Sequence, residues 1–470
     1  MRLGVGVRLS IMMFLQFFVW GAWYVTAPRY LGTIGFGGAD FGWTYSVGPI
    51  AGILSPFFIG MIADRFFATE RMLGVMHLLG AAAMFGATFL MQNPNRSPDL
   101  INLMFFAHML CYFPTLSLTN TLALHNMDDA ERQFPMIRVF GTIGWIAAGF
   151  GLGWLEWGSS INMFYLAASA ALVLGLFSFT LPHTPPPQGG EAVSFRELAG
   201  LDAFVLLKQR AFLTFLVGSF LVCIPLAFYY QMAERAVAQA GLEDPPIKMA
   251  FGQISEIVFM VLMPLFFKRL GVKWMLLVGM GAWVARYALF AVGAPDGIAW
   301  MMIGGIVLHG ICYDFFFVTG QIYTDKVAPA KIRGQAQGML VLFTLGFGML
   351  IGAQVAGSVE EANTPPEGVT LRNQAQEIGG RILELNQKIE PLDQTAAQPL
   401  QDQVAELKMQ QDKLTLSWLE SIQWKTIWMM PAIGVGIIML FFAVLFNERA
   451  DIENVTEDEV AESAVREEQP

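Results

Sequence analysis

Charged residues are scarce in this chain, and their scarcity excludes an ordinary soluble domain. Only 14% of the 470 residues are Asp, Glu, Lys or Arg, whereas 55% are hydrophobic. Soluble globular domains carry about a quarter charged residues. We therefore expect lipid to be the solvent for most of the chain, and nothing in its charge pattern indicates a nucleic-acid partner.

Enzyme signatures are lacking as well. The sequence contains no Walker loop, no legible Ser-His-Asp arrangement and no His or Cys residues at metal-ligand spacing. Cys111, Cys223 and Cys312 fall within apolar stretches, where they are expected to pack as small apolar side chains. We therefore predict no enzyme activity, no cofactor and no metal site. Any transport is gradient-driven or facilitative, because no ATP site is present.

Long apolar stretches are what the chain has in abundance. Each approaches the roughly 20 residues that cross about 30 Å of hydrocarbon as a helix, and backbone groups in lipid must be satisfied internally. The first stretch is too long and too aromatic for a cleaved signal peptide, so it is predicted to remain as a span. The twelve predicted transmembrane helices cover 9–30, 42–63, 72–92, 101–124, 136–155, 161–181, 211–233, 249–267, 273–293, 298–323, 334–357 and 425–446.

A polar, proline-rich connection divides these spans into six and six. A weak repeat supports two related halves, because Ile137-Arg138 opens the fifth span and Ile332-Arg333 the eleventh. Such halves resemble the major facilitator fold, in which a central site lies between them. The predicted domains are an N-terminal half (1–182), a cytoplasmic linker (183–210), helices 7 to 11 of the C-terminal half (211–357), an extracytoplasmic helical hairpin (358–424), helix 12 (425–447) and an acidic cytoplasmic tail (448–470).

The positions of Lys and Arg predict the orientation, because these residues favour cytoplasmic loops. With the N-terminus inside, most of them lie on the cytoplasmic side, and the opposite short loops hold only Arg29, Arg96, Arg235 and Lys248. We therefore predict an inner-membrane protein with both termini in the cytoplasm.

The loop after the second span carries a short motif. Gly60-Met61-Ile62-Ala63-Asp64-Arg65 resembles the superfamily's signature between spans two and three, through Gly60, Asp64 and Arg65. An acidic helix cap beside a cytoplasmic arginine explains the same residues structurally.

The segment between spans eleven and twelve shows a heptad seam. Its apolar positions alternate at spacings of four and three and resume after a proline-bounded turn, a pattern typical of an antiparallel coiled-coil hairpin. The hairpin is predicted to lie outside the cytoplasm, as a self-contained addition or as a surface for a partner or self-association at 371–418. The seam consists of Leu371, Ala375, Ile378, Ile382, Leu385, Ile389 and Leu392, then Leu400, Val404, Leu407, Gln411, Leu414 and Trp418.

Ionisable residues inside the spans are the main functional candidates. Each costs about 2.5 to 3.5 kcal/mol at the centre of a membrane helix, so such residues usually face a cavity or a partner. The charged candidates are Arg138, Glu256, Arg286 and Asp314. A carboxylate in such a place can take up and release a proton as its neighbours change, which is the chemistry of a proton-coupled carrier.

Helical spacing groups polar side chains with these charges. Arg138, Thr142 and Trp145 lie at i, i+4 and i+7 on one face, which suits a ligand with oxygens and a flat ring. Gln253 and Glu256 share a face of the eighth span.

In the tenth span, His309 and Tyr313 share a face and Asp314 is adjacent. Structural ion pairs, Arg138 with Glu256 or Arg286 with Asp314, are the alternative interpretation. Arg286 has no polar companions on its helix, so it is predicted to be structural.

Several segments resemble the nucleoside:proton symporter family of the major facilitator superfamily, over nearly all twelve helices except the hairpin and the tail. These segments are Phe14-Leu15-Gln16-Phe17-Phe18-Val19-Trp20-Gly21-Ala22-Trp23, Tyr112-Phe113-Pro114-Thr115-Leu116, Phe134-Pro135-Met136-Ile137-Arg138-Val139-Phe140-Gly141-Thr142-Ile143-Gly144-Trp145, Gln253-Ile254-Ser255-Glu256 and Asp314-Phe315-Phe316. The resemblance implies a nucleoside cavity lined by Arg138, Thr142, Trp145, Gln253, Glu256 and Tyr313, with Asp314 and Glu256 in proton coupling.

The chain departs from this family at three positions. Ala227 and Tyr230 stand where members of known nucleoside specificity carry amides, and His309 stands where a tyrosine is expected. Tyr230 and His309 therefore join the predicted substrate site. The alternatives are a proton-coupled carrier of a sugar or nucleobase and, in another class, a membrane sensor or scaffold that acts through the hairpin.

Overall fold

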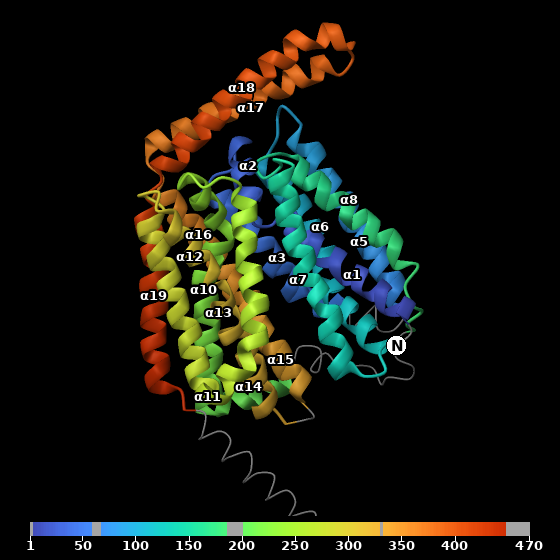
Figure 1. The fold of residues 1–470 in the computed structure, drawn as a ribbon, viewed down its shortest axis with the longest axis vertical. Coiled ribbons are helices and arrows are strands. Elements are labelled where there is room, and N and C mark those ends of the chain that lie inside the picture. Colours follow the sequence, from blue (N-terminus) through green and yellow to red (C-terminus); the bar gives the residue numbers. More distant parts are fainter. Residues whose placement is uncertain (1–2, 59–66, 186–200, 330–331, 448–470) are drawn as a thin grey trace, which may run out of the picture.

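The computed structural model describes residues 3–58, 67–185, 201–329 and 332–447, and every regular element within these ranges is a helix. The all-α class predicted from the sequence is therefore confirmed. The helices form two bundles that lie side by side, with a pair of long helices projecting from one end (Figure 1).

The N-terminal bundle is built from apolar helices that pack on one another, α1 against α7 and α5 against both α6 and α8. Its helices are α1 (Leu3–Gly21), α2 (Ala27–Thr33), α3 (Gly38–Phe58), α5 (Thr69–Met91), α6 (Pro98–His125), α7 (Ala130–Trp154) and α8 (Asn162–Ser178).

The C-terminal bundle contains several helices that are broken within one expected span. Its elements are η2 (Leu201–Lys208), α10 (Arg210–Gln239), α11 (Pro245–Gly293), α12 (Ala299–Val307), α13 (His309–Tyr313), η3 (Asp314–Val318), α14 (Thr319–Val327), α15 (Arg333–Val341), η5 (Leu342–Gly348), α16 (Met349–Ala362) and α19 (Trp424–Leu445). Both η3 and η5 are π-helical, a geometry found mostly as single turns at functional sites.

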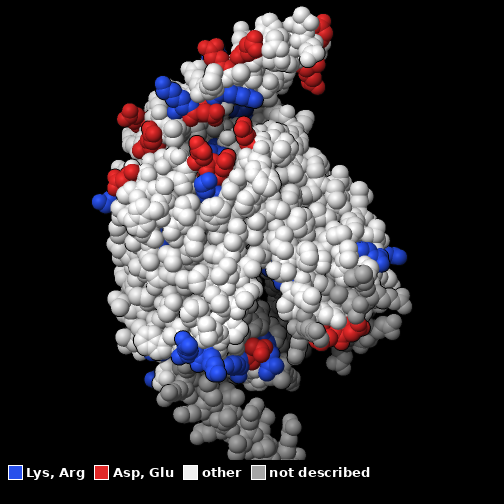
Figure 2. Space-filling view, viewed as in Figure 1, with Lys and Arg blue, Asp and Glu red and all other residues white. Residues whose placement is uncertain are grey.

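Membrane-spanning character is strong along both bundles. Among the described residues, nine helices are long and apolar enough to cross a membrane. The 49-residue α11 covers two predicted spans, 249–267 and 273–293, and Gly271 separates them with φ 69° and ψ 178°, a conformation that favours glycine. Figure 2 shows a broad surface free of charged side chains between two charged ends.

The projecting pair consists of α17 (Pro366–Ile389) and α18 (Gln394–Ser421). The two helices run side by side and are joined by a short turn (Figure 1). Ile378, Ile382 and Val404 are buried between them, and the Asp393 carboxylate caps α18 by accepting from two backbone N–H groups.

The two bundles meet mainly at the end that carries α17 and α18. There α3 packs against α16, α7 against the start of α11, and α2 against both α10 and α17. At the opposite end, Figure 2 shows a hollow between the bundles. The molecule is therefore closed at the hairpin end and open at the other.

Candidate functional site between the two bundles

The N-terminal side of the interface is formed by α7 against α1. The Arg138 guanidinium carbon lies 4.1 Å from the centroid of the Phe17 ring, and the Trp145 ring meets Trp20 edge-on with centroids 5.4 Å apart. Thr142 lies between them on α7 and is half-buried. The i, i+4, i+7 spacing thus presents a cation, a hydroxyl and an indole along one helix.

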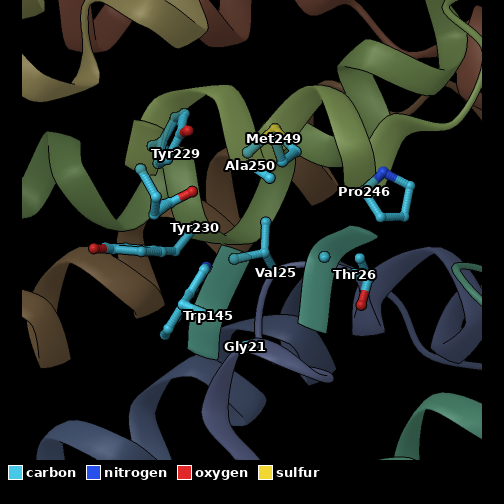
Figure 3. A pocket seen from close by; sticks show the side chains of 11 residues that line it. Gly21, Val25, Thr26, Trp145, Tyr229, Tyr230, Pro246, Met249 and Ala250 are labelled. Atoms are coloured by element: carbon cyan, nitrogen blue, oxygen red, sulfur yellow. The ribbon is translucent and has the colours of Figure 1, made fainter. Parts of the chain in front are cut away.

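Three predicted residues, Trp145, Tyr230 and Gln253, line one small pocket. Its walls come from α1 and α7 on one side and from α10 and α11 on the other (Figure 3). The free volume is about 20 Å³, enough for a single water molecule. In this conformation, with the hairpin end closed, the pocket is therefore too small for a ligand with a flat ring system.

The C-terminal side depends on a close approach of α13 to α11. A Cβ atom on Gly310 would lie 2.5 Å from the carbonyl oxygen of Ser255, so only glycine fits there without a shift. The Gly310 backbone N–H donates to Ser255 Oγ at 2.9 Å. Because α12 ends at Val307, this side-chain acceptor satisfies a donor at the break and brings His309 to the level of Glu256.

Glu256 lies at the centre of the predicted residues. His309 Nε2 is 3.8 Å from Glu256 Oε2, and the His309 and Tyr313 ring centroids are 5.7 Å apart. The charge of Arg138 acts on Glu256 from the other bundle. The structure therefore brings together polar groups from α7, α11 and α13, of which Arg138 and Glu256 lie more than a hundred residues apart in the sequence.

Asp314 is the second carboxyl group of the site. Its side chain is fully buried, and neither carboxyl oxygen has a hydrogen-bond partner in the described part of the chain. It is the first residue of the π-helical turn η3, and the charge of Glu256 acts on it. A buried carboxylate without a partner is costly, and taking up a proton removes its charge.

The alternative of structural ion pairs finds no support between these residues. Within the ranges that the structure describes, no ion pair joins Arg138 to Glu256 or Arg286 to Asp314. Arg286, predicted to be structural, has a polar neighbour that the sequence analysis did not name, since Arg286 Nη2 lies 3.2 Å from His309 Nδ1. This pairing was hidden from the sequence because the partner comes from another helix.

Tyr230 and Ala227, the two positions of the seventh predicted span where the chain departs from the family, have different surroundings in the structure. Tyr230 lines the pocket and meets Tyr24, in the turn that follows α1, with ring centroids 5.6 Å apart. Ala227 is fully buried and packs toward Gly352 of α16. Of the two, only Tyr230 lies in the interface between the bundles.

Trp20 and Tyr24 were missed as site residues. Trp20 is half-buried, lies 5.4 Å from Trp145, and its indole N–H has no partner among the described residues. Their i, i+4 spacing on the aromatic face of the first span was the available signal.

The closed end is held by polar contacts across the interface. Arg29 Nε is 3.3 Å from Glu234 Oε1, and Gln354 Nε2 donates to Ser46 Oγ at 2.8 Å. Within the C-terminal bundle, Arg235 of α10 pairs with Glu360 of α16 at 2.6 Å.

The placement of Arg29 and Arg235 in short loops was wrong. They belong to α2 and α10, and Arg235 is fully buried, because carboxylates distant in sequence compensate both charges. The signature-loop residues Gly60, Asp64 and Arg65 lie outside the described residues.

Comparison with known proteins decides the family. The family model described as "Nucleoside H+ symporter" matches residues 3–372. The chain belongs to the nucleoside H+ symporter family. This is a family of membrane transporters rather than enzymes, and it indicates no cofactor. The resemblance predicted from the sequence is therefore confirmed.

Individual members of the family are similar over most of the chain. The putative nucleoside transporter YegT of Escherichia coli (strain K12) is 41% identical over 378 residues, which cover 77% of this chain and 87% of that protein. The nucleoside permease NupG of the same organism is 31% identical over 380 residues, covering 77% and 90%. The xanthosine permease of Escherichia coli (strain K12) is 30% identical over 371 residues, which cover 76% of this chain and 88% of that protein.

The fold agrees with this membership. A crystal structure of the nucleoside transporter NupG matches with a TM-score of 0.76 and 27% identity, covering 95% of this chain and 100% of that one. The chain is therefore a multi-pass membrane protein with a major facilitator type of fold, as in that symporter family. The family match itself ends within α17.

Proposed function

We propose that this protein takes nucleosides into the cell across the inner membrane in symport with protons. Membership in the nucleoside H+ symporter family supports the reaction. The observation in the structure that supports it is a pair of buried carboxyl groups, Glu256 and Asp314, of which Asp314 has neither a hydrogen-bond nor an ion-pair partner among the described residues. A proton on such a carboxyl group is retained or released according to which end of the molecule is open.

The substrate is held by aromatic rings and a ring of hydrogen-bonding groups. Trp145 and Tyr230 offer flat surfaces for a base, since base–aromatic stacking is worth about 1–3 kcal/mol per base. Arg138, Thr142 and Gln253 donate to base or ribose oxygens. Further contacts come from Glu256, which accepts from hydroxyl groups, and from Tyr313 and His309.

Asp314 is the group we assign to the coupling proton. It is fully buried and lacks a hydrogen-bond partner among the described residues, so its neutral form is favoured whenever the site is dry. Glu256, by contrast, has Arg138 and His309 as neighbours, and we assign it to the substrate, as an acceptor for hydroxyl groups.

Alternating access requires two halves that rock about this site. We propose twelve crossings, six per half, with α11 counted twice and with α12 to α14 and α15 to α16 counted as one crossing each. The domain boundaries predicted from the sequence stay as proposed: 1–182, 183–210, 211–357, 358–424, 425–447 and 448–470.

Exposed basic residues support an orientation with the hairpin outside and the termini in the cytoplasm. Lys and Arg gather at the end opposite the hairpin (Figure 2), where Lys268, Arg269, Lys326 and Arg333 are exposed. Basic residues favour the cytoplasmic side. In this orientation the structure is closed outward and open inward.

Uptake into proteoliposomes tests the function. With the lumen made alkaline, we expect accumulation of radiolabelled uridine, adenosine or xanthosine above the level reached without a gradient. Free bases and sugars should compete poorly. Asp314→Asn and Glu256→Gln should each reduce accumulation to the level reached without a gradient. The first amide cannot carry the coupling proton, and the second removes the carboxylate that accepts from the substrate.

Asp296→Asn is the matched control, since Asp296 is an exposed carboxylate outside the interface. Accumulation that persists in Asp314→Asn would overturn the coupling assignment. Accumulation of sugars rather than nucleosides would overturn the substrate.

A further inference from the structure

Arg286 is a buried cation with no carboxylate beside it in the part of the chain that the structure describes. Its side chain is fully inaccessible, and no carboxylate lies within ion-pair distance of it in the ranges that the structure describes. The guanidinium carbon lies 3.5 Å from the centroid of the Tyr229 ring, which stabilises a desolvated cation in part. Burying a charge without a counterion is energetically costly, so we expect Arg286 to interact with a polar group close to it.

Its hydrogen-bond partner is His309. Arg286 Nη2 lies 3.2 Å from His309 Nδ1. A guanidinium has donors only and keeps its proton at every physiological pH. The Nδ1 atom must therefore be the acceptor, with its lone pair directed at Arg286.

The tautomer of His309 follows from that contact. A neutral imidazole has one protonated nitrogen and one acceptor, so acceptance at Nδ1 places the hydrogen on Nε2. That atom lies 3.8 Å from Glu256 Oε2. The contact is longer than a hydrogen bond, and its attraction is electrostatic.

We propose that Arg286 is a positioning residue that locks His309 as the neutral Nε2–H tautomer. His309 then offers a donor to Glu256 and has no free nitrogen for the coupling proton. This inference rests on the proposed proton symport, because it explains why a histidine in the cavity leaves the coupling proton to the carboxyl groups.

The other groups around His309 are compatible with this state. Tyr229 stacks on the imidazole with centroids 5.5 Å apart, and Tyr313 lies at 5.7 Å on its own helix. Glu256 is the only carboxylate within 4 Å of the imidazole among the described residues. A protonated His309 would face the Arg286 cation at hydrogen-bond distance, and like charges at that separation repel.

Nitrogen NMR of the isotope-labelled histidines tests the lock directly in the purified full-length protein. The chain has five histidines, and the loss of one signal in His309→Gln assigns His309. In the wild type we expect one neutral Nε2–H tautomer between about pH 5 and 8, the range in which an ordinary histidine titrates.

Arg286→Met should release the lock. We then expect His309 to take up a proton within this range or to populate the Nδ1–H tautomer. Arg286→Lys, which keeps a cationic donor, should retain the wild-type signal, and Arg269→Met is the matched control because Arg269 is exposed on the same helix. The inference is overturned if wild-type His309 takes up a proton, or if Arg286→Met leaves the same neutral tautomer at every pH.

Uptake supplies a second measurement that a merely structural role would not change. Accumulation at a fixed pH gradient should fall in Arg286→Met and recover when His309→Gln is added, because glutamine keeps a donor but cannot bind a proton. A double variant that accumulates no more than Arg286→Met also overturns the inference. The NMR result needs no substrate, so failure of nucleoside uptake in the wild type would reject the proposed function separately.

Discussion

Trp145 faces two groups of aromatic side chains at once. From α7 it packs edge-on against Trp20 of α1, and with Tyr230 of α10 it lines the pocket between the bundles. Because Trp145 is only half-buried, part of its ring stays available to a ligand when the bundles separate.

Trp145→Ala should therefore weaken substrate binding more than folding. We expect the KM for nucleoside uptake to rise about tenfold, since stacking on one base is worth about 1–3 kcal/mol. Initial-rate uptake over a range of nucleoside concentrations measures this change. Trp154→Ala is the control, because Trp154 lies on the same helix and is 75% exposed. An equal KM in both variants would show that Trp145 does not contact the base.

At the scale of elements, the hairpin of α17 and α18 connects one bundle to the other. It continues from α16 of the C-terminal bundle but packs on α2 of the N-terminal bundle. The Trp418 ring lies so close to Gly32 that a Cβ there would be 2.5 Å from it.

Asp412 adds an electrostatic contact at the same junction. Burial raises the pKa of the Asp412 carboxyl, and the charges of Arg29 on α2 and of Lys408 oppose that change. The hairpin thus stabilises the closed end in this conformation.

Trp418→Ala should loosen this end. We expect spin labels at Ala39 and Glu243, exposed positions at the hairpin end of each bundle, to show a larger population at long distance by double electron–electron resonance. The reason is that removing the indole takes away the apolar contact between α18 and α2. Met409→Ala is the control, since Met409 is 68% exposed on the same helix. Identical distance distributions in Trp418→Ala and wild type would contradict a role of the hairpin in closure.

For the whole molecule, the decisive feature is how closely α3 and α16 approach at the closed end. A Cβ on Gly357 would lie 2.4 Å from the carbonyl oxygen of Gly38, so the two backbones are in direct contact there. The bundles can close at this end only because both residues lack side chains.

Gly357→Trp should therefore hold the hairpin end open. We expect uptake to be lost while nucleoside binding from the outside persists, with the same spin-label pair shifted to long distance. Gly434→Trp on α19 is the control, because a Cβ at Gly434 has no neighbour within 4 Å. Wild-type uptake in Gly357→Trp would show that transport does not require this closure.

Much of this arrangement could be predicted from local patterns. The apolar stretches, the face shared by Arg138, Thr142 and Trp145, and the heptad seam all depend on spacing within one helix, which the sequence displays directly. The role of Arg286 could not be predicted in this way, because it depends on contacts with His309 and Tyr229 on other helices. The same holds for Arg235, whose partner Glu360 is 125 positions away.

The sequence alone predicted that most of this protein lies in the membrane, that its structure is helical and that a few of the spans contain ionisable residues. These properties follow from composition and from the helical period, both of which are local. The arrangement of the helices in space was needed to show which end is closed, that Asp314 has no hydrogen-bond partner in the described ranges and that Arg286 contacts His309. Those outcomes depend on distances between helices, and the packing of glycines such as Gly310 and Gly357 sets these distances.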